Sequence, residues 1–134
     1  MRASAARTRP IRVLIADDHT LFAEALKAIL ATDDRFDVVG RARNGEQAVD
    51  LHQELRPDVV LMDISMPVLD GVDAVRKIRK KRPSANILML TGSNSLHDID
   101  RSRKAGAAGY VTKDKIAAEL IDAIVEAAGR PKPK

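Results

Sequence analysis

The amino-acid sequence predicts an α/β fold, a doubly wound, five-stranded parallel sheet with strand order 2-1-3-4-5. Five short apolar runs alternate with five segments of helical periodicity, and such alternation builds parallel sheets with right-handed crossovers. The first, third and fourth runs are the most apolar, as strands covered on both faces are, so they belong in the centre of the sheet. The second and fifth are shorter and more polar, which predicts edge strands. The 134 residues show no internal repeat and are long enough for one domain with its own core.

The third run, Val-Val-Leu-Met at 59–62, is the stretch around which the chain is organised. It ends on Asp63, and Pro67 follows four residues later, where a strand can no longer continue. A carboxylate at the end of a buried strand is poorly suited to a core. Because open α/β sheets bind ligands at the carboxyl ends of their strands, Asp63 is a candidate site residue.

Before this strand, the apolar pattern predicts a strand at 11–16, a helix over 21–30, a strand at 36–40 and a helix from Asn44 to about Leu55. Asn44 is expected to cap that second helix, with Gln47 three residues further on as its capping-box partner. The acidic pair Asp17-Asp18 follows the first strand. Its ordinary structural explanation is that one of the two caps the first helix.

After Asp63, the pattern predicts a third helix whose basic run 76–82 faces solvent, a strand at 87–90, a fourth helix, a strand at 109–112 and a fifth helix. Ser95 and Asp98 form a capping-box pattern at the start of the fourth helix, and Gly106 is expected to end it. Asp114 is expected to cap the fifth helix.

Polar side chains follow the ends of four predicted strands, namely Asp17 and Asp18, Asp63, Thr91 and Lys113. In a parallel sheet these ends lie along one rim, so residues distant in sequence converge there. Three carboxylates in one pocket raise one another's pKa unless a cation lies among them, and Mg²⁺ accepts such oxygen ligands. Lys113 and Thr91 would hold phosphate oxygens, and an Asp nucleophile completes the groups needed for phosphoryl transfer to a carboxylate.

Together these motifs resemble the receiver domains of two-component response regulators, from about Ile11 to Ala128. The shared motifs are the pair Asp17-Asp18, Asp63 with Met66-Pro67 and Gly71 behind it, Thr91-Gly92, and Gly109-Tyr110-Val111-Thr112-Lys113. The resemblance implies a flavodoxin-like fold and a domain that accepts a phosphoryl group from a sensor histidine kinase on Asp63. It also implies that the domain is no enzyme beyond its own phosphorylation and slow hydrolysis.

The resemblance further assigns roles to individual residues of the predicted site. Asp18, Asp63 and the carbonyl of Ser65 would bind Mg²⁺ directly, and Asp17 would act mainly through water. Thr91, besides its part in the chemistry, would form a switch pair with Tyr110. In this pair the hydroxyl moves onto the phosphoryl group and the ring turns inward.

The fourth predicted helix differs from the others in its apolar content. It has only Leu96, Ile99 and Ala105 to bury against five charged residues, so it should be the least firmly held helix. Switching motions are drawn from elements of low stability. We therefore expect the fourth helix, the fifth strand and the fifth helix to form the signalling face.

The motifs at 16–19 and 109–114 look like the NarL/LuxR-type subfamily, whose receivers precede a helix-turn-helix DNA-binding domain. Many receivers have Pro after the Lys, where this chain has Asp114.

We expect a disordered arm at 1–10, a receiver domain over 11–129, and at 130–134 a tail or the start of a linker to an output domain absent from this chain. The expected output is transcription. The alternative is a stand-alone receiver that acts by docking, and the sequence leaves open whether phosphorylation forms a homodimer.

Composition excludes several other classes of function. The net charge of +4 arises in the two tails, whose six cations and no acids leave the body of the chain at −2. With one Tyr, two Phe and no Trp, the body offers neither a basic footprint nor a stacking platform, so direct nucleic-acid binding is not expected. The chain has no Cys and no apolar run of membrane-spanning length. We expect a cytoplasmic protein with no membrane association.

Two other functions fit parts of the pattern less well. A Mg²⁺-dependent phosphatase that forms an aspartyl phosphate generally needs a second Asp two residues after the nucleophile, where this chain has Ser65. A flavin-binding protein of this topology would need a phosphate-binding loop after the first strand, where two acids stand instead. The histidines His19, His52 and His97 show no ligand spacing and are expected on the surface.

Overall fold

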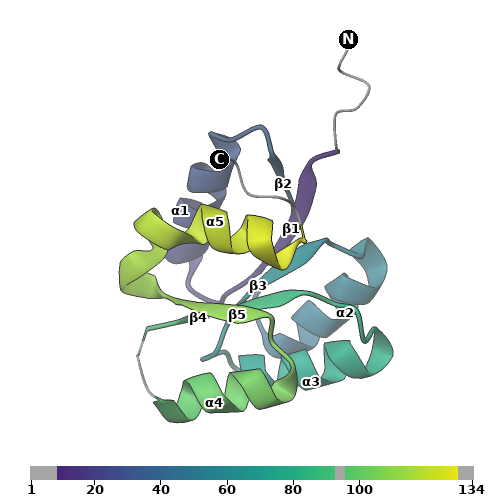
Figure 1. Ribbon diagram of the computed structural model, residues 1–134. Helices are drawn as coiled ribbons and strands as arrows, with labels where there is room; N and C mark the ends of the chain where they lie inside the picture. Colours follow the sequence, from purple (N-terminus) through teal and green to yellow (C-terminus); the bar gives the residue numbers. More distant parts are fainter. Residues whose placement is uncertain (1–8, 93–95, 130–134) are drawn as a thin grey trace.

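A five-stranded parallel sheet forms the middle layer of the protein, in the order β2-β1-β3-β4-β5. This order is the one that the apolar content of the strands predicts. The computed structural model describes residues 9–92 and 96–129 (Figure 1). The strands are β1 (Ile11–Ala16), β2 (Phe36–Ala42), β3 (Val59–Asp63), β4 (Ile87–Thr91) and β5 (Gly109–Thr112). Strand β2 is two residues longer than predicted.

Helices cover both faces of the sheet (Figure 1). They are α1 (Thr20–Ala31), α2 (Gly45–Leu55), α3 (Gly71–Lys81), α4 (Leu96–Ala105) and α5 (Ile116–Ala127). α1 and α5 pack on one face, and α2, α3 and α4 pack on the other. A short 3₁₀ helix, η1 (Lys113–Lys115), joins β5 to α5. No helix in the described part of the chain is long and apolar enough to cross a membrane.

The two cores meet across β3, which explains why this strand has no polar residue before its end. Val59 and Leu61 belong to the core beneath α1 and α5, whereas Val60 and Met62 belong to the core beneath α2, α3 and α4. All five residues of the strand are buried, including Asp63. Each large apolar side chain buried in this way contributes about 1.5–3 kcal/mol. The position of Asp63 is therefore fixed by packing on both faces of the sheet.

The helix ends show where local signals were sufficient and where they were not. The Asn44 carboxamide accepts a 2.8 Å hydrogen bond from the backbone N–H of Gln47, which confirms the predicted cap. The Gln47 side-chain oxygen accepts a 2.8 Å hydrogen bond from the backbone N–H of Arg43, one residue upstream of the usual partner. Gly106 has a φ of +103° directly after α4, so it ends that helix as predicted.

The predicted cap of the fifth helix is wrong, and so is the alternative explanation that the acidic pair caps the first helix. The N-cap position of α5 is Lys115, without a side-chain hydrogen bond, because Asp114 lies inside the 3₁₀ turn that precedes the helix. The N-cap of α1 is His19, so neither Asp17 nor Asp18 caps this helix. The Asp17 carboxylate instead accepts a 2.8 Å hydrogen bond from the N–H of His19 itself. The predicted cap at Ser95, residues 1–8 of the arm predicted over 1–10, and the tail at 130–134 lie outside the described residues.

Helix α4 buries less apolar surface than predicted. Leu96 is 82% exposed, and the buried residues are Ile99, Ala105 and the polar Ser102. The Ser102 hydroxyl donates a 2.8 Å hydrogen bond to the carbonyl of Asp98, so its burial within the helix is satisfied. Because Leu96 is the first residue of the helix, its side chain lies beyond the edge of the core. Helix α4 thus buries one apolar residue fewer than the sequence suggests, and its low stability remains a prediction.

The histidines also differ from the prediction. His97 is exposed, but His52 is only 4% exposed, on the side of α2 that packs against α3. Its spacing from Ala48 and Val49 places it on the buried face of the helix. The isolated position of His52 in the sequence concealed this burial.

Candidate functional site

The ends of three strands bring carboxylates and an amine together at the carboxyl edge of the sheet. Asp17 and Asp18 follow β1, Asp63 is the last residue of β3, and Lys113 follows β5. Asp17 and Asp63 are 0% and 3% exposed, whereas Asp18 is open to solvent. One ligand atom from each of Asp17, Asp18, Asp63 and His19 lies within 4.8 Å of the others. We refer to Asp17, Asp18, His19, Asp63 and Lys113 as the acidic site.

The backbone of Asp63 is held between β3 and the start of α3. The N–H of Gly71 donates a 2.8 Å hydrogen bond to the carbonyl of Ile64. A Cβ atom at position 71 would lie 2.2 Å from the carbonyl oxygen of Asp63, so only glycine allows this close approach. The Asp70 carboxylate caps α3 through the N–H of Asp73 at 2.9 Å. The loop after Asp63 therefore returns closely to the strand end.

Asp17 is fixed by hydrogen bonds on both sides. Its N–H donates to the carbonyl of Ala42 at 3.0 Å, which continues the pairing of β1 with β2. Its carbonyl accepts hydrogen bonds from the guanidinium of Arg41, at 3.1 Å from Nη2. Its carboxylate accepts from the N–H of His19. The buried carboxylate thus has a fixed orientation toward Asp63.

Lys113 supplies the positive charge of the acidic site. Its Nζ lies 3.5 Å from Asp17 Oδ2 and 3.5 Å from Asp63 Oδ1. The same ammonium group lies over the ring of Phe22, 4.3 Å from the centroid, in a cation–π arrangement. Two carboxylates and one ring therefore position the amine beside Asp63.

His19 belongs to the acidic site although the sequence prediction left it out. Its Nδ1 lies 3.1 Å from Asp17 Oδ1, 3.3 Å from Asp18 Oδ1 and 3.8 Å from Asp63 Oδ2. The side chain is 62% exposed, so the expectation of a surface residue is correct for exposure. Its adjacency to the acidic pair, at the first turn after a strand, was the signal available in the sequence.

The acidic site carries more negative than positive charge. Burial raises the pKa of Asp63 from its ordinary 3.8, and the neighbouring Asp17 raises it further, against the opposite effects of Lys113, the backbone of Ser65 and His19. Asp63 Oδ2 is buried without a hydrogen-bond partner among the described residues. A set of carboxylate oxygens with one of them unsatisfied fits a hard cation. The protein thus has an acidic pocket that could bind a metal.

The other predicted site residues are Ser65, Thr91 and Tyr110, on the loop after β3 and on strands β4 and β5. Ser65 is exposed in the loop two residues after Asp63. Thr91 is buried at the end of β4, one residue beyond Leu90, the partner of Asp63 in the sheet. Thr91 pairs with Thr112. Tyr110 is two residues before Thr112 in β5, so its side chain points to the same face of the sheet as Thr112 and its partner Thr91. Tyr110 is 45% exposed.

Comparison with known families agrees with this fold and this arrangement. Residues 13–125 match the response regulator receiver domain. The chain belongs to this family, as the sequence motifs predicted. Its sheet order is the flavodoxin-like order expected of receivers.

Individual relatives support the same assignment. The transcriptional regulatory protein MctR of Rhizobium johnstonii is 41% identical over 119 residues, which cover 89% of this chain and 56% of MctR. The signal receiver domain of NarL from Mycobacterium tuberculosis has a TM-score of 0.87 at 30% identity, covering 91% of this chain and 98% of that one. The response regulator domain of CheB from Thermotoga maritima has a TM-score of 0.85 at 32% identity, covering 92% and 100%. The chain spans about half the length of the curated relatives it matches.

Proposed function

We propose that this receiver domain accepts a phosphoryl group on Asp63 and switches conformation in response. The observation that carries the proposal is the buried Asp63 carboxylate, which has one oxygen without a hydrogen-bond partner among the described residues and the other 3.5 Å from Lys113 Nζ. A carboxylate with one unsatisfied oxygen and a cation beside the other is arranged as a nucleophile whose product charge is already compensated.

The residues of the acidic site then divide the work of transfer. An Asp63 oxygen attacks phosphorus as the bond from phosphorus to the donor's histidine nitrogen breaks, and that nitrogen keeps the electron pair. Lys113 neutralises negative charge on the transferred group, and the Thr91 hydroxyl donates to a phosphoryl oxygen. Mg²⁺, held by Asp18, Asp63 and the Ser65 carbonyl with Asp17 acting through water, would offset the remaining charge of the carboxylates and the phosphate.

The proposed donor is a sensor histidine kinase, and the proposed output is transcription. MctR and other relatives are transcriptional regulatory proteins, and this chain matches about half of their length. We therefore propose that the receiver controls a DNA-binding domain, acts in the cytoplasm and catalyses nothing beyond its own phosphorylation and dephosphorylation. Dimerisation on phosphorylation is a further proposal of the same kind.

The proposed signalling face is α4, β5 and α5, with Thr91 and Tyr110 as the switch pair. Tyr110 lines a cavity of about 140 Å³ together with Ile99 and Ser102 of α4, the helix that we expect to be the least firmly held, so its ring has space beside that helix. Amide hydrogen exchange should show faster exchange in α4 than in α2, and a change in α4 on phosphorylation. Equal protection of the two helices, unchanged by phosphorylation, would contradict this part of the proposal.

The direct test is intact mass after incubation with acetyl phosphate and Mg²⁺, with and without a chelator. We expect a gain of one phosphoryl group that requires the metal, is labile to base and disappears in Asp63→Asn. Asp73→Asn, which removes an exposed carboxylate of α3, is the matched control and should keep the gain. A mass gain that survives in Asp63→Asn, or no gain from either acetyl phosphate or a phosphorylated kinase, would refute the assignment.

A further inference from the structure

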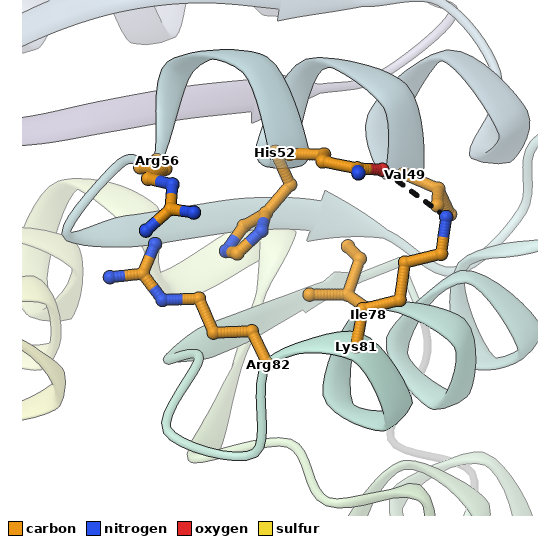
Figure 2. Close-up of a pocket in the computed structure, with 7 residues that line it drawn as sticks. Val49, His52, Arg56, Ile78, Lys81 and Arg82 are labelled. Atoms are coloured by element: carbon orange, nitrogen blue, oxygen red, sulfur yellow. Dashed lines mark hydrogen bonds between the residues drawn. The ribbon is translucent and has the colours of Figure 1, made fainter.

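A second charged cavity lies between the C-terminal ends of α2 and α3, away from the acidic site (Figure 2). Its volume is about 230 Å³, and its lining includes His52 of α2, Lys81 of α3, and the C-cap residues of these helices, Arg56 and Arg82. We call it the basic cavity. No carboxylate is among the residues that line it, all of which lie in the described part of the chain.

Arg82 is the residue whose environment is incomplete. Its Nη1 is buried and has no hydrogen-bond partner among the described residues. Arg56 ends α2 in the left-handed conformation, with a φ of +48°, and its side chain turns into the cavity. Figure 2 shows the guanidinium groups of Arg56 and Arg82 directed toward each other beside the ring of His52. Two like charges converging around a buried, unsatisfied N–H group are costly unless an anion lies between them.

His52 contributes a donor rather than a third charge. Burial lowers the pKa of His52 from its usual 6.5, and Arg82 and Arg56 lower it further. The ring is therefore neutral at neutral pH and carries one N–H group. A neutral imidazole between two guanidinium groups adds a hydrogen-bond donor without adding to their repulsion.

The neighbouring groups do not already neutralise the two guanidinium groups. The carbonyls of Leu55 and Arg56 at the end of α2 accept hydrogen bonds from Arg12 of β1, at 2.8 and 3.0 Å. Lys81 Nζ donates to the Gln53 side chain at 3.2 Å. Two acids of α2, Glu46 and Asp50, line an adjoining cavity with Lys77 and Lys80, and neither of these acids lines the basic cavity. In the described chain, neither Arg56 nor Arg82 forms an ion pair within 4.0 Å.

We propose that the basic cavity binds a tetrahedral oxyanion of the phosphate class, either inorganic phosphate or the phosphate of a small monoester. The Arg56 and Arg82 side chains present planar forks of N–H donors, which match the oxygen pairs of phosphate. The His52 N–H group supplies a further donor. This binding site is independent of phosphoryl transfer at Asp63, because it shares no residue with the acidic site.

The test follows the three histidine rings by NMR while inorganic phosphate is added to the whole chain at neutral pH. Neither phosphate nor sulfate donates a phosphoryl group, so the acidic site stays unmodified. We expect a saturable shift of the His52 ring signals, assigned with His52→Gln, and no comparable shift of exposed His97. Sulfate should act in the same way, and sodium chloride at equal ionic strength should not. A parallel titration with glycerol 3-phosphate distinguishes the two sources of the ligand. Tighter binding of glycerol 3-phosphate than of inorganic phosphate would indicate an organic monoester, and equal binding of the two would indicate the free ion.

The matched variants are Arg82→Gln, at the C-cap of α3 inside the cavity, and Arg76→Gln, within α3 outside the cavity, which remove the same charge. Loss of one charged hydrogen-bond donor should weaken phosphate binding about tenfold or more in Arg82→Gln and leave Arg76→Gln close to wild type. Arg56→Gln provides a second, independent variant if Arg82→Gln fails to fold. Equal affinity in the inner and outer variants, or a His52 shift that chloride reproduces, would overturn the proposal and leave a water-filled cavity.

Discussion

The acidic site and the basic cavity are electrostatic opposites built into one fold. Among the described residues, two buried side-chain polar atoms lack a hydrogen-bond partner, and each region contains one of them, Asp63 Oδ2 and Arg82 Nη1. Lys113 partly compensates the acids of the first region. The lining of the second region contains no acid at all.

Both regions favour the neutral form of their buried titratable group. The pKa of Asp63 is raised and the pKa of His52 is lowered, first by burial in both cases, so each group is driven toward its neutral form. Because the two pKa shifts have opposite signs, the contributions of Asp63 and His52 to stability depend on pH in opposite directions. The comparison teaches that an unsatisfied buried charge marks the place where the folded chain lacks a partner.

The largest effect is expected where the compensating charge of the acidic site is removed. Lys113→Met should slow phosphoryl uptake from acetyl phosphate by about 10²–10³-fold, the usual consequence of losing a group that stabilises transferred charge. The rate is read from intact mass over time. Lys115→Met, an exposed residue of the same 3₁₀ turn, serves as control, and equal slowing in both variants would show that Lys113 has no special part.

A steric change next to Asp63 should have the next largest effect. It tests the geometry of the acidic site without changing its charge. Gly71→Ala places a Cβ atom 2.2 Å from the Asp63 carbonyl oxygen, so the free energy of unfolding should fall by about 2–3 kcal/mol. Urea unfolding measures this loss. Gly92→Ala, whose Cβ atom would meet nothing within 4 Å, should change stability by much less. A tolerated Gly71→Ala would mean that the loop after Asp63 moves freely.

Removal of the acidic charge itself should stabilise the metal-free protein. The pKa of Asp63 is raised above 3.8, so the stability that the neutral carboxyl provides is present at low pH and is lost as pH rises through the folded-state pKa. Asp63→Asn should therefore increase the free energy of unfolding at neutral pH by about 1 kcal/mol, without divalent cations. The gain should shrink as pH falls toward 4. A destabilised Asp63→Asn would contradict the proposed repulsion from Asp17.

The smallest effect on stability is expected at the basic cavity, and its dependence on pH is opposite to that of Asp63. The pKa of His52 lies below 6.5, so its contribution to stability is present above that pH and is lost as pH falls through the folded-state pKa. Wild-type protein should lose up to about 1 kcal/mol as pH falls from neutral, and His52→Gln should lose less. Urea unfolding at a series of pH values gives both curves. Exposed His97→Gln should follow wild type, and a His52→Gln curve as steep as wild type would show that another group titrates.

Much of the fold could be predicted because the signals are local. The wholly apolar runs at β3 and β4, and the more polar ones at β2 and β5, are sufficient to order the sheet, since burial on two faces permits no polar alternation. The convergence of Asp17, Asp63 and Lys113 follows from strand polarity alone. Their detailed roles in chemistry remain predictions that the experiments above test.

The parts that sequence reasoning missed depend on contacts between elements. His52 looks isolated in the sequence, but α2 packs its buried face against α3 and brings His52 beside Arg82. His19 joins the acids because the chain turns sharply after β1. Leu96 is apolar and exposed because α4 begins beyond the core, and Asp114 misses its cap because a 3₁₀ turn precedes α5. None of these outcomes is encoded in periodicity.

The single tyrosine of the chain has a practical consequence. The protein contains no tryptophan, so emission excited in the tyrosine absorption band comes from Tyr110 alone. This residue is 45% exposed on β5 and borders α4. Acrylamide quenching or anisotropy decay of that emission therefore reports on one position of the edge strand, without a label or an added fluorophore. The domain therefore carries its own optical probe beside α4, the helix that we expect to be the least firmly held.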